Sequence, residues 1–207
     1  MILGDSYSTF CGYIPEGHGW WYSTEAYPDN KVQTVEDTWW WRVFSEVDGR
    51  IALNSSWTGT TVCHTGWGGE DCRHKSFISR FDKLIEDGYF KENKIDTLIV
   101  FGGTNDSWSG SPLGEVKFDN ITDEDLYSFC PAVCYLAGRI KEALPNARVI
   151  FLVNAGLKDE INFATGEACR HYGHEILYLS MMDRFNNHPT NKGMKEIADE
   201  LLSYLNK

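Results

Sequence analysis

Short runs of consecutive apolar residues recur along the chain, each bounded by polar or glycine-rich segments. Unbroken apolar runs, in contrast to alternating ones, are typical of strands buried on both faces of a sheet. We therefore predict five mostly buried strands. The runs are Met1-Ile2-Leu3 and residues 51–53, 97–101, 149–153 and 176–179.

Between these runs, apolar residues recur with helical spacing. The clearest case runs from Met194 to Leu205, where they lie at i, i+3, i+4, i+7, i+8 and i+11. Strands and helices alternate, which predicts an α/β fold. We expect a three-layer α/β/α sandwich, in which a mostly parallel, doubly wound sheet has helices on both faces. The predicted helices span about 34–47, 73–87, 123–143, 158–172 and 190–205.

Composition limits the size and the partners of the protein. With 207 residues, 42% of them hydrophobic, we expect one domain over residues 1–207. The formal charge of −11 repels phosphate backbones, so we expect no nucleic-acid partner. No apolar run approaches the roughly 18 residues of a membrane span. The sequence leaves the oligomeric state open.

The start of the chain has no basic region followed by a long apolar stretch, so no export signal is visible. We therefore expect a cytoplasmic protein. Because only three residues precede Gly4, the first strand is short. Export followed by removal of a leader is the alternative.

The cysteines are spread along a chain that is large enough to fold without disulfides, so reduced thiols are expected. Cys63 and Cys72 bracket a glycine-rich loop and could pair in an exported protein. The Cys- and His-containing stretch 169–175 lies where a helix gives way to a strand, and we expect no metal there and no cofactor elsewhere. The six cysteines are Cys11, Cys63, Cys72, Cys130, Cys134 and Cys169.

Polar and glycine residues follow four of the predicted strands. In parallel sheets, ligands bind beyond the carboxyl ends of the strands, so these segments should meet at one edge. A serine, a glycine, an asparagine and a histidine then converge there: Ser6 in Gly4-Asp5-Ser6, Gly59 in the segment 54–59, Asn105 in Gly102-Gly103-Thr104-Asn105-Asp106, and His188 before the last helix. Taken alone, the Gly4-Asp5-Ser6 triplet favours a helix cap over a nucleophile.

The four blocks, in this order and at these spacings, resemble the SGNH (GDSL-type) hydrolase superfamily across essentially the whole chain. The resemblance implies a flavodoxin-like arrangement of the sheet and a serine hydrolase without a metal. It also implies that Ser6 is the nucleophile and His188 the base. The Ser6 N–H, the Gly59 N–H and the Asn105 side chain would form the oxyanion hole.

The residue types suit these roles. A glycine such as Gly59 lets the backbone approach a substrate without a Cβ. An asparagine amide donates two hydrogens and carries no charge. The alternative interpretations are structural, since Asn105 could be a turn residue and His188 a residue at the entry to a helix.

Tryptophan is abundant, with eight in the chain. Trp57 and Trp108 flank the inferred oxyanion loops, and we expect them to contact a sugar ring or an acyl chain. The favoured function is hydrolysis of short-chain esters, with an acetyl group on a carbohydrate as the expected substrate. The alternatives are a thioesterase or lysophospholipase of the same superfamily, and a noncatalytic sugar-binding protein with a degenerate site.

One position departs from the pattern of the superfamily, whose members commonly carry Asp three residues before the histidine. That position is Phe185 here. The imidazole still needs an acceptor for its Nδ1–H. Asp183 is the nearest carboxylate, and a backbone carbonyl in the loop 183–187 is the alternative. We favour the carbonyl, which would make Ser6 and His188 a dyad.

Overall fold

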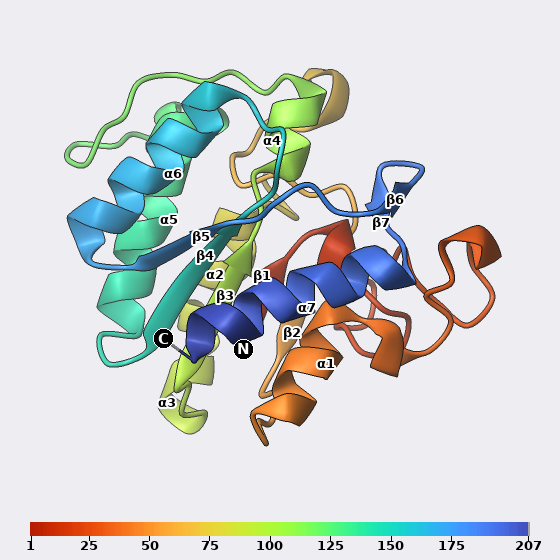
Figure 1. The fold of residues 1–207 in the computed structure, drawn as a ribbon. Helices are drawn as coiled ribbons and strands as arrows, with labels where there is room; N and C mark the ends of the chain where they lie inside the picture. Colours follow the sequence, from red (N-terminus) through yellow and green to blue (C-terminus); the bar gives the residue numbers. More distant parts are fainter. Residues whose placement is uncertain (207) are drawn as a thin grey trace.

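The computed structural model describes residues 1–206, and at its centre lies a parallel sheet of five strands in the order β2-β1-β3-β4-β5. Figure 1 shows this sheet between two layers of helices. The predicted α/β sandwich is thereby confirmed. The strands are β1 Ile2–Gly4, β2 Asn54–Ser56, β3 Thr97–Phe101, β4 Arg148–Val153 and β5 Glu175–Tyr178.

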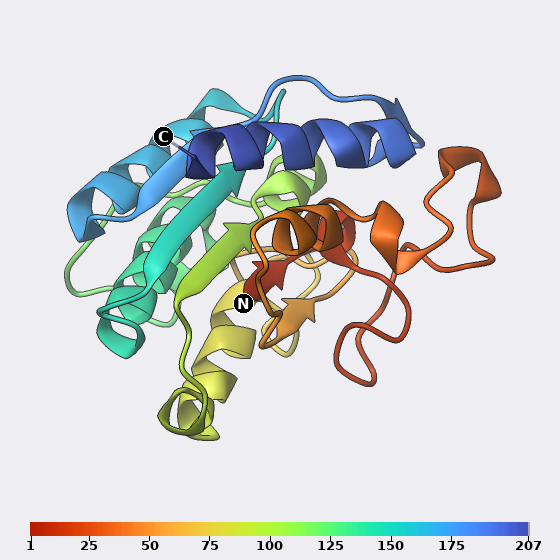
Figure 2. The same cartoon turned by 60° about the horizontal axis from the view of Figure 1, so that its bottom comes forward.

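The helices divide between the two faces of the sheet. Helices α1 and α7 pack together on one face, and α2, α5 and α6 cover the other (Figures 1 and 2). Alternate strand residues serve the two cores: Ile2 faces α1 and α7, whereas Leu3 belongs to the opposite cluster. The helices are α1 Trp39–Glu46, α2 Phe77–Glu86, α3 Tyr89–Glu92, α4 Thr104–Ser109, α5 Phe129–Ala143, α6 Asp159–Tyr172 and α7 Asn191–Leu205.

In the part of the chain that the structure describes, five short 3₁₀ helices lie in the connections: η1 Ser6–Ser8, η2 Pro28–Asn30, η3 Val35–Asp37, η4 Trp67–Gly69 and η5 Asp125–Tyr127. Between residues 1 and 206, no helix is both long enough and apolar enough to cross a membrane.

The predicted position of the second strand was wrong. The apolar run 51–53 precedes the strand, and β2 consists of Asn54, Ser55 and Ser56, which the sequence analysis assigned to a loop. These polar residues are buried because their side chains find partners: Asn54 Nδ2 donates to the Ser8 carbonyl at 2.8 Å and Ser56 Oγ donates to Asn54 Oδ1 at 2.6 Å. Hydrogen bonding therefore replaces apolar burial in this edge strand.

A two-stranded hairpin, β6 Arg184–Phe185 and β7 His188–Pro189, was not predicted. Its two turn residues, Asn186 and Asn187, have φ values of 49° and 62°. Positive φ at both positions is typical of a type I′ turn, and asparagine tolerates this conformation better than most residues. The hairpin leads directly into α7 (Figure 1).

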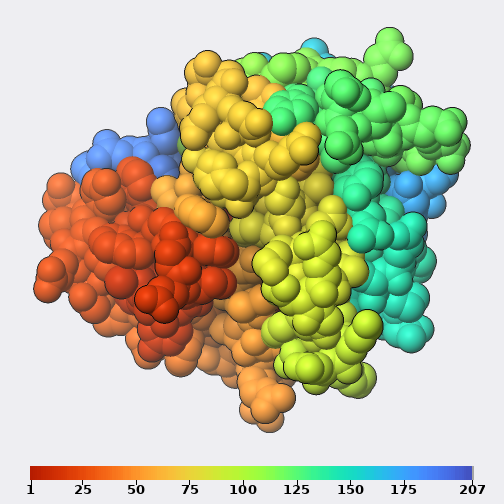
Figure 3. Space-filling view, turned by 180° about the vertical axis from the view of Figure 1, so that it is seen from behind, coloured from red at the N-terminus to blue at the C-terminus, as the bar shows by residue number. Residues whose placement is uncertain are grey.

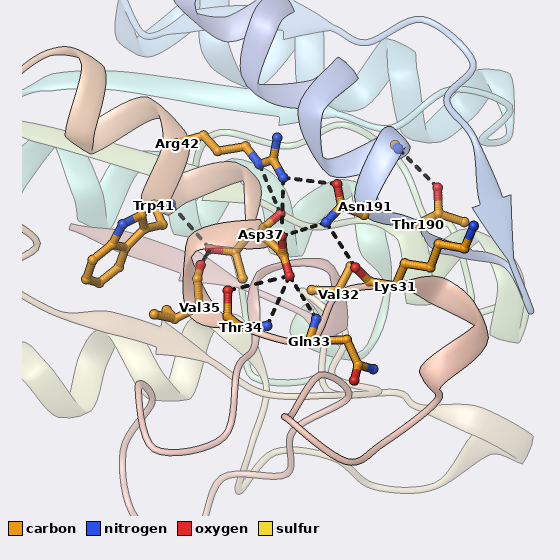
Figure 4. Close-up of polar contacts among 12 residues, drawn as sticks. Lys31, Val32, Gln33, Thr34, Val35, Asp37, Trp41, Arg42, Thr190 and Asn191 are labelled. Atoms are coloured by element: carbon orange, nitrogen blue, oxygen red, sulfur yellow. Dashed lines mark hydrogen bonds and ion pairs between the residues drawn. The ribbon is translucent and has the colours of Figure 1, made fainter.

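A long segment of residues 9–38 connects η1 to α1 and extends away from the sheet (Figure 2). Its far end is anchored to the start of α7. Asp37 accepts hydrogen bonds from the N–H groups of Gln33 at 2.9 Å and Thr34 at 3.0 Å, and from Asn191 Nδ2 at 2.6 Å (Figure 4). Asn191 Nδ2 also donates to the Lys31 carbonyl at 2.9 Å. The segment is thus attached to the helix that follows the hairpin.

Candidate active site

Ser6 lies in the turn that follows β1, at the start of η1, and only 4% of the residue is exposed. Asp5 caps this turn, since its Oδ1 accepts from the Tyr7 N–H at 3.0 Å. Gly4 is needed because a Cβ there would lie 2.6 Å from Ser56 Oγ and 2.8 Å from Ser8 Cβ. The Gly-Asp-Ser sequence therefore allows β1 to turn sharply and presents the serine at the carboxyl end of the sheet.

His188 lies against this serine, with its Nε2 2.9 Å from Ser6 Oγ. The other ring nitrogen, Nδ1, lies 2.9 Å from the backbone carbonyl oxygen of Asn186. A carbonyl can only accept, so Nδ1 carries the proton and Nε2 is free to accept the hydroxyl proton of Ser6. The hydrogen-bonded pair is thus arranged as a nucleophile and its base.

The acceptor of the Nδ1 proton lies in the loop 183–187, as the sequence analysis favoured. Asp183 is used elsewhere, because its carboxylate accepts from the Thr190 hydroxyl and its carbonyl accepts from the Thr190 N–H at 3.1 Å. Phe185, at the position where an acid was expected, is the cross-strand partner of His188 in the hairpin. The type I′ turn brings the Asn186 carbonyl to the imidazole.

The three expected oxyanion donors are available. Neither the Ser6 N–H nor the Gly59 N–H has a hydrogen-bond acceptor within residues 1–206. Gly59 has φ of 74°, and a Cβ there would meet open space. Asn105 Nδ2 donates to the Thr60 carbonyl at 2.9 Å, which uses one of its two hydrogens. The second hydrogen remains for a ligand.

The loops that carry these donors are tied together by two buried charged residues that sequence reasoning missed. Arg80 donates to the Gly4 carbonyl at 3.1 Å and to Thr60 Oγ1 at 3.2 Å. Asp106 accepts from the N–H groups of Val62 at 2.9 Å and Cys63 at 3.1 Å. Burial lowers the pKa of Arg80 to about 9, and nearby Asp5 opposes that shift. These bonds fix the turn that contains Ser6 and the loop that contains Gly59 in position relative to each other.

Burial favours the neutral form of the His188 imidazole. Burial lowers its pKa to about 4; the Asn186 carbonyl opposes this shift, and the positive charge of Arg184 adds to it. Arg184 is held by Asn154, whose Oδ1 accepts from the guanidinium at 2.6 Å. Arg184 belongs to no motif, so only the hairpin geometry places it near the base.

Trp21 is a further residue that the sequence analysis missed. Its ring is stacked on the His188 imidazole, with centroids 3.6 Å apart and planes 8° from parallel. Tyr27 stacks with Trp21 at 4.3 Å and 8°. Both aromatic residues come from the long segment 9–38, whose sequence has no feature that indicates proximity to His188.

The two tryptophans that we expected to bind substrate lie in different surroundings. Trp57 stacks on His18, with centroids 4.3 Å apart, and lines a surface pocket of about 720 Å³. His18 belongs to the N-terminal segment, and Trp57 follows β2 directly. Figure 3 shows the face on which the N-terminal segment (red) lies beside the segments that follow β2 (orange and yellow). Trp108 is partly buried and packs edge-on against Tyr7 at 6.3 Å. Within residues 1–206, the rings that pack on His188 are those of Trp21 and Tyr7, not those of Trp57 and Trp108.

In the described part of the chain, the cysteine thiols form no disulfides. Cys63 and Cys72 are buried free thiols, and so are Cys130, Cys134 and Cys169, whereas Cys11 is an exposed free thiol. Within residues 1–206, no group of three or more His, Cys, Asp or Glu side chains is arranged to hold a metal ion.

Comparison with known proteins places the chain in a family. The sequence profile of the GDSL-like lipase/acylhydrolase family matches residues 1–205. The chain belongs to this family. It is therefore a hydrolase, in agreement with the superfamily that the sequence motifs resemble. Among curated proteins, no significant relative was found.

Solved structures agree with this assignment to the GDSL-like family. A protein classed as a GDSL-like lipase from Bacteroides ovatus is 39% identical, with a TM-score of 0.92 over 99% of this chain and 96% of the other. A second, from Bacteroides uniformis, is 40% identical, with a TM-score of 0.91 over 99% and 93%. An acetyl xylan esterase from Butyrivibrio proteoclasticus shares the fold at 20% identity, with a TM-score of 0.64 over 99% and 62%.

Proposed function

We propose that this GDSL-like hydrolase is a serine esterase that removes short acyl groups, acetyl above all, from carbohydrates. The observation that carries the proposal is the 2.9 Å contact between Ser6 Oγ and His188 Nε2, with Nδ1 directed to the Asn186 carbonyl. A helix-capping serine has no need of a neutral imidazole on its hydroxyl.

In the proposed reaction, Ser6 Oγ forms a bond to the ester carbonyl carbon while its proton passes to His188 Nε2. The negative charge moves to the former carbonyl oxygen, which the Ser6 and Gly59 N–H groups and the Asn105 amide stabilise. Collapse of this intermediate breaks the bond to the alcohol, which takes the proton from Nε2. Water then attacks the acyl carbon while its proton passes to His188 Nε2. The bond between the acyl carbon and Ser6 Oγ breaks, Ser6 Oγ takes the proton back from Nε2, and the carboxylic acid leaves.

The substrate class has separate support. The Butyrivibrio esterase shares the fold and acts on acetylated xylan. A net charge of −11 disfavours strongly anionic substrates. Trp57 lines an open pocket next to the Gly59 loop, where an aromatic ring could contact a sugar. The competing thioesterase and lysophospholipase functions would use the same residues and differ in the acyl compound that they hydrolyse.

An organophosphonate probe should form a covalent adduct on Ser6, because a base-activated hydroxyl attacks such electrophiles. Mass spectrometry of the digested protein should locate the added mass on the peptide that contains Ser6, and Ser6→Ala should abolish it. Ser8, in the same 3₁₀ helix, has no hydrogen-bond partner for its hydroxyl within residues 1–206, so Ser8→Ala serves as the matched control that keeps the label. An unlabelled wild-type peptide would favour a noncatalytic protein.

Trp57→Ala and Trp108→Ala should raise KM for an acetylated oligosaccharide more than for a small aryl acetate. A stacking surface acts on the part of the substrate remote from the bond that breaks. Steady-state kinetics with both substrates measures the difference. If both KM values rise equally, the two rings only support their loops, through His18 for Trp57 and Tyr7 for Trp108.

A further inference from the structure

The base of this site has an unusual set of neighbours. In the proposed reaction the His188 imidazole becomes positively charged, yet the groups that face it offer little compensation. Nδ1 meets a neutral carbonyl, the charge that acts on the pKa of His188 is the cationic Arg184, and the Tyr7 ring lies 5.6 Å away. Asp183 is bonded to Thr190. The carboxylate that would stabilise an imidazolium in a triad is therefore missing.

The remaining contact is the face of Trp21. The two rings are nearly parallel with centroids only 3.6 Å apart, so they overlap with little lateral offset. Neutral aromatic pairs prefer offset or edge-on arrangements over such a sandwich. A cation over the indole face, in contrast, is attracted by the negative π surface. The geometry therefore suits the charged imidazole better than the neutral one.

The position of Trp21 is fixed from several sides. The backbone N–H of Trp21 donates to Thr9 Oγ1 at 2.9 Å, and the Thr9 hydroxyl donates in turn to the Ser6 carbonyl at 3.0 Å. The next residue, Tyr22, is buried and donates from its hydroxyl to the Pro189 carbonyl at 2.8 Å. Tyr27 stacks with the indole. Trp21 itself is thus bonded to the turn that contains Ser6, and its neighbour Tyr22 is bonded to the hairpin that carries the base.

We propose that Trp21 is a positioning residue that takes over part of the role of the missing acid, by stabilising the imidazolium of His188 through its π face. This inference rests on the proposed function. As the Ser6 Oγ–H bond breaks and the proton moves to Nε2, the attraction between His188 and Trp21 strengthens. Only an interaction that grows toward the transition state raises kcat.

The test changes the electrons of the ring and keeps its shape. Trp21 is replaced site-specifically by mono-, di- and tetrafluorotryptophan, in which each fluorine withdraws charge from the π face. We expect kcat for an aryl acetate to fall stepwise, by about five- to thirtyfold at the tetrafluoro ring, with KM little changed. The rate of organophosphonate labelling of Ser6 should fall in parallel, since that reaction uses the same proton transfer.

The same fluorinated series at Trp67, which is 48% exposed in η4, is the matched control and should leave both rates unchanged. A flat series at Trp21, with labelling at the wild-type rate, would overturn the inference and leave Trp21 as packing. Failure of the proposed function has a different signature: the unmodified protein would not label at Ser6, or Ser6→Ala would keep its activity.

Discussion

Replacing His188 by alanine should lower kcat for aryl-acetate hydrolysis by about 10⁴- to 10⁶-fold, because the Ser6 hydroxyl then has no group to accept its proton. Within residues 1–206, His188 is the only side chain that forms a hydrogen bond with Ser6 Oγ, at 2.9 Å from its Nε2. The measurement is the initial rate at saturating substrate, with circular dichroism to verify folding.

Asp183→Asn is the control that distinguishes a dyad from a triad. The Asp183 carboxylate accepts a hydrogen bond from Thr190, and an asparagine oxygen can accept the same bond. Its loss of kcat should stay below about tenfold, whereas disabling a true triad acid costs nearer 10⁴. A loss of three orders of magnitude in a folded Asp183→Asn protein would mean that the acid reaches His188 during the reaction.

Asn105→Ala should lower kcat by about 10²- to 10³-fold, the usual effect of removing one oxyanion donor. KM should change little, because the negative oxygen exists only after attack, so kcat and kcat/KM should fall together. The variant also loses the 2.9 Å bond to the Thr60 carbonyl, so thermal unfolding is measured alongside.

Asn105→Asp keeps the size of the side chain while it removes both N–H donors and adds a negative charge. It should lose at least as much activity as Asn105→Ala. Near-wild-type turnover in either variant would remove Asn105 from the oxyanion hole and leave it as the residue that ties α4 to the Gly59 loop.

The sequence predicts the sheet well where strands are apolar. Residues 97–101 match β3, and the runs near 149–153 and 176–179 match β4 and β5 within one residue. It fails for β2, whose strand residues are polar and are buried through side-chain bonds that periodicity cannot detect. It also fails for the β6–β7 hairpin, because strands of two residues are too short to show an alternation of apolar and polar positions. The Asn186-Asn187 pair is nevertheless a usable turn signal.

The site divides in the same way. Ser6 and His188 could be named because order along the chain implies convergence at the carboxyl edge, and the structure places them 2.9 Å apart. Arg80 and Trp21 could not, since each acts through a contact between segments far apart in sequence. Arg184 is only four positions from His188, but the hairpin that brings it near was not predicted. The Arg80–Gly4 and Trp21–His188 contacts span 76 and 167 positions. Such contacts have no local pattern.

The anchored segment 9–38 has an evolutionary consequence. It is held at three places: Thr9 accepts from the Trp21 N–H near Ser6, Tyr22 donates to Pro189 of the hairpin, and Asp37 accepts from Asn191 at the start of α7. Lengthening a surface loop between fixed ends costs little, since each doubling adds only about 0.6 kcal/mol of closure entropy. Insertions and duplications around residues 24–26, which lie at the surface between Tyr22 and Tyr27, can therefore accumulate without disturbing Ser6 or the sheet. Descendants of one ancestral hydrolase could diverge in selectivity there while inheriting the same catalytic chemistry.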